Sequence, residues 1–262
     1  MNIKFIGTGS GLTSLDRNHS SFLINSSDCK VLVDCGDGIS KALLSQSVNF
    51  NTINSIIISH LHADHFAGLP SLLTQMKLNS RKEKLSIYIY KSDKEFLTQF
   101  IQHSYLFFDR LLFELDIIPF AEEEKIFLTD DFYFISKRNS HLDKYRKNKT
   151  SAALSYTSLS FLFLDNENSV IYTGDVGTDN DLFLFGDKVD WLITEITHIS
   201  LAGIISLIEK KIANRIILTH LDRLSDKIIL DLKKHFEIDF SNNNILIASD
   251  GFELNHYNSN CL

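Results

Sequence analysis

One stretch of seven residues limits what this chain can fold into more than any other. Residues 59–65 read Ser-His-Leu-His-Ala-Asp-His, which places three histidines and an aspartate within six positions. The apolar, β-branched residues 55–58 before it predict a buried strand, and residues 71–76 after it form an amphipathic segment. Metal-binding side chains therefore crowd the point where a strand turns into a helix.

The polar side chains of this stretch suit a metal site. Imidazole and carboxylate groups are ligands for zinc and similar divalent metals. In an extended turn His60 and His62 can point the same way, whereas Asp64 and His65 begin the next element and point elsewhere. The spacing thus predicts two ligand pairs, enough for two adjacent metal ions.

The bulk composition indicates a globular protein. The chain has 262 residues, 44% of them hydrophobic, which is enough for a substantial core. The net charge of −7 argues against broad, nonspecific nucleic-acid binding. Cys29, Cys35 and Cys261 have no paired spacing and predict no disulfide framework. We find no signal peptide and no apolar run of membrane-spanning length, so we expect a cytoplasmic protein without membrane contact.

Strand and helix patterns alternate twice along the chain, and no Gly/Ser-rich linker separates the two series. We therefore expect a single domain over residues 1–262, made of two β-rich halves with helices outside. This is an α/β fold, a four-layer αβ/βα sandwich. The expected strands are 2–6, 21–24, 30–34, 55–58, 85–90, 152–156, 160–164, 170–172, 190–195, 215–220 and 245–248, with a further strand pattern around 127–135. The expected helices include 93–105, 200–211 and 225–235.

A glycine-rich stretch, residues 7–11, follows the first expected strand. It lacks a lysine, and no clear helix follows it, which favours tight turns over a nucleotide-binding loop.

Polar residues close several of the apolar strands. Asp34, His60, the Thr-Gly-Asp at 173–175, Glu195 and His220 each stand at a strand end. They can converge at one edge of the paired sheets, which is what a metal site on rigid elements requires.

The motifs together resemble a known family. The stretch 60–65 resembles the HxHxDH motif of the metallo-β-lactamase fold, and His141, Thr-Gly-Asp at 173–175 and Leu-Thr-His at 218–220 follow in the family order. Within that superfamily the chain most resembles the ribonuclease Z-like phosphodiesterase branch, through Arg-Asn-His-Ser-Ser at 17–21 and Val-Asp-Cys-Gly-Asp-Gly at 33–38.

The resemblance implies a dinuclear hydrolytic centre. The expected cofactors are two divalent ions, most consistent with Zn²⁺ and alternatively Mn²⁺. A water that bridges them would be deprotonated near neutral pH and attack a phosphodiester. The implied ligands are His60, His62 and His141 for the first ion, Asp64, His65 and His220 for the second, and Asp175 as the bridge.

Further residues are expected to take part in catalysis or substrate binding. The expected catalytic residues are Asp64, Glu195 and His198. Asp64 can also orient the attacking hydroxide, and His198, three residues beyond Glu195, is the candidate proton donor for the leaving group. Arg17 and Asn18 are expected to face substrate. A basic run from 137 to 149 stands beside His141, and within it Arg138 is a candidate phosphate clamp. Alternatively, the basic run is a solvated loop with no part in substrate binding.

The departures from the ribonuclease Z pattern reduce the range of substrates to be expected. Thr13 and Leu15 occupy the places of a proline and a lysine, and only 33 residues lie between His141 and Asp175, too few for the tRNA-gripping arm of those enzymes. We therefore expect hydrolysis of nucleotide-sized phosphodiesters such as cyclic nucleotides.

Two other functions stay open. The chain could be an RNA or tRNA 3′-processing endonuclease without the arm, in which a homodimer could pair two basic runs into a longer track. It could also be a metal-loaded binding protein without turnover, although the complete ligand set disfavours this.

Overall fold

The computed structural model describes residues 1–147, 154–236 and 244–255, and its contacts divide the chain into two compact units. The first unit comprises residues 1–121 and 249–255, and the second comprises 122–248 as far as they are described. That the chain forms a single domain stays a prediction.

The first unit is built on a mixed sheet of seven strands. Three antiparallel pairings at one side of this sheet are followed by three parallel pairings at the other. In spatial order the strands are β14 (Glu253–Asn255), β1 (Asn2–Gly7), β2 (Ser21–Ser26), β3 (Cys29–Val33), β4 (Ser55–Ile57), β5 (Leu85–Tyr90) and β6 (Leu115–Phe120).

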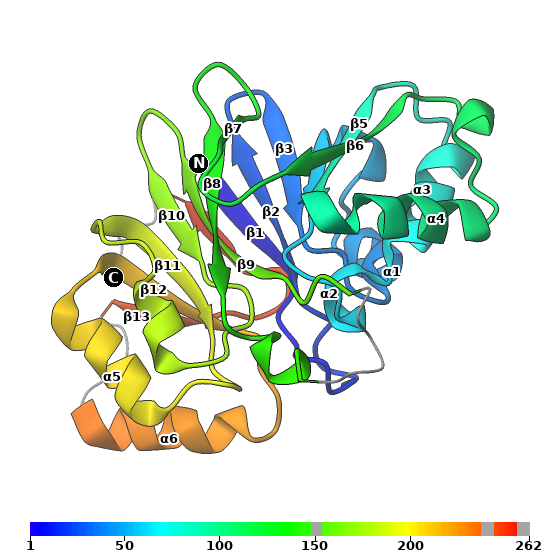
Figure 1. Ribbon diagram of the computed structural model, residues 1–262. Helices are drawn as coiled ribbons and strands as arrows, with labels where there is room; N and C mark the ends of the chain where they lie inside the picture. Colours follow the sequence, from blue (N-terminus) through cyan, green and yellow to red (C-terminus); the bar gives the residue numbers. More distant parts are fainter. Residues whose placement is uncertain (148–153, 237–243, 256–262) are drawn as a thin grey trace. The chain divides into compact units, whose positions relative to one another are not determined.

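Helices pack their apolar sides against this sheet and close its core. Buried residues of β3–β5 meet Leu43 of α1, Leu72 of α3 and Leu97 of α4, and α4 lies beside β6 (Figure 1). The helices are α1 (Ile39–Ser45), α2 (Ala63–Phe66), α3 (Leu69–Leu78) and α4 (Lys94–His103), with short 3₁₀ turns η1 (Phe50–Thr52), η2 (Lys91–Asp93) and η3 (Phe108–Arg110).

The second unit repeats the same pattern of pairing. Its seven-stranded sheet again has three antiparallel pairings followed by three parallel ones, and α5 and α6 pack on its parallel part (Figure 1). The elements in spatial order are β7 (Lys125–Phe127), β8 (Tyr133–Asn139), β9 (Ser158–Leu164), β10 (Ser169–Tyr172), β11 (Val189–Glu195), β12 (Ala213–Thr219) and β13 (Ile245–Ile247), with α5 (Leu201–Lys210), α6 (Ser225–Phe236), η4 (Asp143–Tyr145) and η6 (Asp179–Phe183).

The expected α/β class is therefore confirmed, with three local differences. Neither β6 nor β14 is among the expected strands; β6 contains Pro119 and is an edge strand, where a residue without an N–H is tolerated. The expected strand at 152–156 is absent from its described part, 154–156, and 152–153 lie outside the described residues. None of the helices in the described ranges combines the length and apolar composition needed to cross a membrane.

The glycine-rich stretch serves a close approach of two backbones rather than the expected tight turn. Residues 7–11 form no hydrogen-bonded turn, and Gly9 instead makes a β-bridge with His19. A Cβ atom added at Gly7 would lie 1.8 Å from the carbonyl oxygen of His19, so only glycine allows these two backbones to approach.

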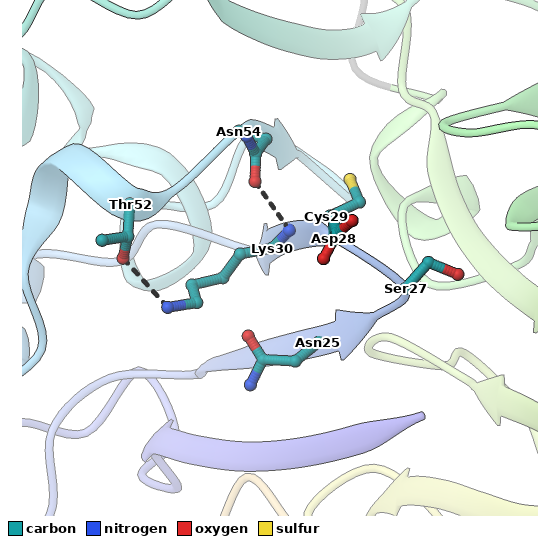
Figure 2. A pocket seen from close by; sticks show the side chains of 7 residues that line it. All are labelled: Asn25, Ser27, Asp28, Cys29, Lys30, Thr52 and Asn54. Carbon is teal, nitrogen blue, oxygen red and sulfur yellow. Dashed lines mark hydrogen bonds between the residues drawn. The ribbon is translucent and has the colours of Figure 1, made fainter.

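A pocket of about 460 Å³ lies at the β2–β3 turn (Figure 2). Asn54 accepts a hydrogen bond from the Lys30 backbone N–H, and the Lys30 side chain donates to Thr52. Burial raises the pKa of the Cys29 thiol in its wall to about 11, so this thiol stays protonated at neutral pH. The pocket lies at the amino end of β3, and the predicted metal ligands follow the carboxyl ends of the strands, so it is not part of the predicted site.

A buried arginine ties the first unit together. Arg81 is 1% exposed, and burial lowers its pKa. Its guanidinium donates 2.7–2.9 Å hydrogen bonds to four backbone carbonyl oxygens, those of Asn51, Ile53, Glu83 and Lys84. These bonds join η1 to the segment that enters β5.

Replacing Arg81 with methionine should destabilise the protein. The Arg81→Met variant keeps the aliphatic part of the side chain but leaves four carbonyl groups without their donor, which we expect to cost about 3 kcal/mol and lower the melting temperature by roughly 5–10 °C. Lys82→Met, at an exposed neighbour, is the matched control. Equal melting temperatures for the two variants would contradict this role of Arg81.

Candidate metal centre

The first unit places predicted metal ligands and the residues that hold them at the carboxyl ends of two parallel strands. Asp34 follows β3, and Ser59 and His60 follow β4 with one residue between. Because β3 and β4 are parallel neighbours, these ends meet at the same edge of the sheet. Asp34 has a left-handed backbone with φ of 60°, which is strained for a non-glycine residue and is held by buried contacts.

Asp34 anchors this cluster through both of its oxygens. It is fully buried, and it accepts hydrogen bonds from the Ser59 N–H and hydroxyl, each at 2.8 Å. Its Oδ2 also lies 2.7 Å from Nδ1 of His65. A carboxylate can only accept, so His65 carries its proton on Nδ1, and Nε2 is left with a lone pair for a metal.

The Ser59 hydroxyl links His60 to Asp34 and thereby determines which ring nitrogen of His60 donates a hydrogen bond. Because the Ser59 hydroxyl donates to Asp34, it can only accept from Nδ1 of His60, 3.1 Å away. In its neutral form His60 then has its lone pair on Nε2, which lies 3.0 Å from Nδ1 of His62. Nε2 of His65 lies 3.5 Å from Oδ2 of Asp64. Ring nitrogens and carboxylate oxygens brought this close favour cations.

The second unit gathers a complementary set at its own strand ends. Asp175 follows β10, His220 follows β12 and His141 follows β8. Oδ2 of Asp175 lies 3.7 Å from Nε2 of His141, and Oδ1 lies 3.3 Å from Nε2 of His220. One buried carboxylate thus faces two imidazole rings, one with each oxygen.

Both of these histidines are also held through Nδ1. His141 donates to the carbonyl oxygen of Val176 at 3.3 Å. His220, which like Asp34 has a left-handed backbone (φ 54°), lies 3.1 Å from the hydroxyl of Thr197. That hydroxyl donates to Glu195 at 2.6 Å, so it accepts from His220. In Glu195–Thr197–His220, as in Asp34–Ser59–His60, a hydroxyl donates to a buried carboxylate and accepts from Nδ1 of a histidine.

Glu195 also holds the candidate proton donor. Its Oε1 lies 2.9 Å from Nδ1 of His198, and this hydrogen bond raises the pKa of His198. Burial opposes ionisation of Glu195, but the His198 hydrogen bond and neighbouring histidines outweigh it and lower the pKa of the carboxyl group. The His198 ring lies 4.8 Å from that of His141 and 6.0 Å from that of His220, between centroids.

The residues present fit divalent metals. Every predicted ligand is an imidazole or carboxylate group, and possible donor atoms lie within 4.8 Å of one another for His60 with His62, for Asp64 with His65, and for Asp175 with His141 and with His220. Glu195, His198 and His220 form a further such group. The ligand assignment over both units remains a proposal.

The predicted substrate-binding residues have partners within their own units. Arg17 donates to the hydroxyl of Thr8, and the Asn18 side chain donates to Asp250. Arg138 pairs with Asp143 and donates to the carbonyl oxygen of Tyr156. Contact with substrate stays a prediction for all three. The part of the basic run beyond residue 147 lies outside the described residues.

Sequence reasoning left the anchoring roles of Asp34, Ser59 and Thr197 unassigned. The sequence pattern marks Asp34 only as a polar strand end and Ser59 only as the first residue of the 59–65 stretch, and it assigns nothing to Thr197. The available signal was position: Ser59 precedes His60, and Thr197 lies two residues after the buried Glu195.

Removing the Thr197 hydroxyl should weaken metal binding. Thr197→Val keeps the shape but deprives Nδ1 of His220 of its acceptor, which we expect to reduce metal affinity about 10–100-fold. Thr197→Ser should restore it, and Thr98→Val, which removes a hydroxyl from α4, should have no effect. Competition titration with a metal indicator measures the affinities. Unchanged affinity in Thr197→Val would disprove the anchoring role.

Comparison with known proteins supplies the family. The family model described as "Anti-Pycsar protein Apyc1" matches residues 1–247. The ribonuclease Z of Methanosarcina mazei is 38% identical over 100 residues, a match that covers 38% of this chain and only 33% of that protein. The chain thus matches about a third of that relative's length.

Solved structures agree with the fold. YhfI from Bacillus subtilis, a metallo-β-lactamase fold protein, has a TM-score of 0.76 and 21% identity over 97% of this chain and 98% of its own. The short form of human tRNase Z (ELAC1) has a TM-score of 0.72 and 21% identity over 97% and 99%. The predicted metallo-β-lactamase fold and the ribonuclease Z-like relationship are confirmed. Since the family model spans nearly the whole chain, the protein belongs to the anti-Pycsar protein Apyc1 family.

Proposed function

We propose that this protein is a phosphodiesterase that binds two divalent metal ions, zinc being the expected metal, and hydrolyses nucleotide-sized phosphodiesters such as cyclic nucleotides. The observation that carries the proposal is the anchoring of the histidines. Within each unit, buried groups hold Nδ1 of the rings and turn Nε2 toward a carboxylate.

The proposed ligand sets follow the family pattern. In the first unit the convergence of His60 and His62 supports one metal, and that of Asp64 and His65 supports the other. In the second unit the two oxygens of Asp175 support its role as the bridge. The sets are His60, His62 and His141 for one ion, Asp64, His65 and His220 for the other, and Asp175 for both.

The chemistry of such a centre suits phosphodiester hydrolysis. When bound, the metals lower the pKa of coordinated water and offset the charge of the phosphate. Asp64 orients the attacking water by accepting its hydrogen bond. The water oxygen bonds to phosphorus as the ester oxygen leaves, and Nε2 of His198 gives that leaving oxygen its proton. Glu195 accepts from Nδ1 of His198 and stabilises the ring while it is charged.

The charges of the basic run support a small substrate. Arg138 and Arg146 share the carboxylate of Asp143, and Lys137 donates to the carbonyl oxygen of Leu184. These cations are thus engaged within their own unit. Only 33 residues separate His141 from Asp175, and they include β9 and β10, which leaves no room for an RNA-gripping arm.

A second candidate function is cleavage of RNA. It is favoured by the identity to ribonuclease Z from several organisms, between 33% and 39% over the matched segments. Under this alternative the basic run would contact the phosphate backbone, alone or in a homodimer.

Loss of Asp175 should have a different effect from loss of His198. Asp175→Ala should lose both metals and all activity, because the bridge contacts both ions. His198→Gln should keep about two metals per chain and lose roughly 10²–10⁴-fold in kcat, because only the proton donor is gone. Elemental analysis and steady-state kinetics measure these effects, with Asp187→Ala at an exposed site as the control. Two retained metals in Asp175→Ala, or full activity in His198→Gln, would contradict the respective role.

Small substrates should be cleaved far better than precursor tRNA. We expect kcat/KM for a 3′,5′-cyclic mononucleotide to exceed that for a precursor tRNA at matched, moderate salt, because a long polyanion needs a broad basic surface. Both substrates should be inert once the metals are removed with a chelator. Efficient release of the tRNA 3′ trailer with intact cyclic nucleotides would instead establish the RNA function.

A further inference from the structure

We infer that Leu12 and Leu15 form an apolar contact for the nucleobase of the substrate; this rests on the proposed function and assigns recognition of the base to one loop of the first unit. Both side chains belong to the loop of residues 10–16. Leu12 is 57% exposed, and Leu15 is fully exposed. Both side chains leave apolar surface exposed to water, and burial of that surface by a ligand is favourable.

The loop begins beside a proposed metal ligand. A Cβ atom added at Gly11 would lie 3.3 Å from Oδ2 of Asp64, so the backbone of Gly11 passes directly over that carboxylate. Leu12 is the next residue along the chain. A phosphodiester held at Asp64 and His65 would therefore have its phosphate next to the start of this loop. The sugar and base that extend from the phosphate would then come within reach of the two leucines.

Hydrogen bonds hold the chain on both sides of this loop in place, at residues 8–10 and 18–19. The Gly9 N–H donates to the carbonyl oxygen of Asn18 at 2.7 Å, and Nδ1 of His19 lies 2.8 Å from the carbonyl oxygen of Ser10. Asp250 accepts hydrogen bonds from the Thr8 hydroxyl and from the Asn18 backbone, each at 2.7 Å. The two ends of the loop that carries the leucines are thus fixed, which limits the conformational entropy lost when a ligand binds them.

The chemistry of the contact is selective. The methyl groups of leucine pack on the weakly polar face of a planar heterocycle but gain nothing from a charged phosphate. Leu12 and Leu15 should therefore raise affinity for the nucleoside part of a substrate and leave the cleavage of the phosphodiester itself unchanged. We expect each leucine to contribute up to about tenfold in binding.

The test compares a substrate that has a base with one that lacks it. The metal-loaded full-length protein and its Leu12→Ser/Leu15→Ser double variant are assayed with 3′,5′-cyclic nucleotides and with the 3′,5′-cyclic phosphate of methyl riboside. We expect KM for the cyclic nucleotides to rise at least about tenfold in the variant, with kcat nearly unchanged, and KM for the base-free compound to change less than about twofold. Leu44→Ser, which removes a 67% exposed leucine from α1, should match the wild type with both substrates.

Other outcomes would overturn the inference. Unchanged kinetics for the nucleotides, or an equal loss with both substrates, would show that the leucines do not contact the base. A change in particle mass by light scattering in the double variant would assign them instead to contact with a second copy of the chain. A wild-type protein that cleaves neither substrate would refute the proposed function itself, a result that does not depend on the variant.

Discussion

The candidate site depends on how buried carboxylates control the histidine rings. Asp34 does this directly for His65 and through the Ser59 hydroxyl for His60. Glu195 does it for His220 through the Thr197 hydroxyl. In each case the anchor accepts a hydrogen bond from Nδ1–H, which leaves the lone pair of the neutral ring on Nε2, the form that a metal requires. Ligands whose tautomer is set beforehand lose less entropy when an ion binds.

The sheets make this control possible. Each sheet has three antiparallel pairings followed by three parallel ones, and the carboxyl ends of neighbouring parallel strands share an edge. Asp34 and His220, in different units, both leave their strands with a left-handed backbone, at a cost of about 1–3 kcal/mol each. The hydrogen bonds around them offset this strain. Rigid strands thus carry the polar groups, while the exposed leucines stand on a loop next to them.

The sequence predicted the fold class, because that class depends on local patterns of strands and helices. Apolar strands that end in polar residues indicate candidate ligands, and the predicted convergence of His60 and His62 is present in the structure, whereas the full ligand set stays a prediction. The anchoring roles of Ser59 and Thr197 depend on the direction of a single hydroxyl proton, which no periodicity encodes. The four carbonyl groups that accept hydrogen bonds from Arg81 belong to residues 51, 53, 83 and 84. This spacing follows no helix or strand period, so the sequence pattern does not predict these bonds.

The tautomers of the histidines can be measured directly. Nitrogen-15 NMR of the ring nitrogens, recorded near pH 8 on metal-free protein, distinguishes a proton on Nδ1 from one on Nε2. We expect His60, His65, His141 and His220 each to carry the proton on Nδ1, and added zinc to shift the signal of their Nε2 atoms. Protonated Nε2 atoms in the metal-free protein would contradict the claim that the buried carboxylates, and the Val176 carbonyl group for His141, prepare these rings for a metal.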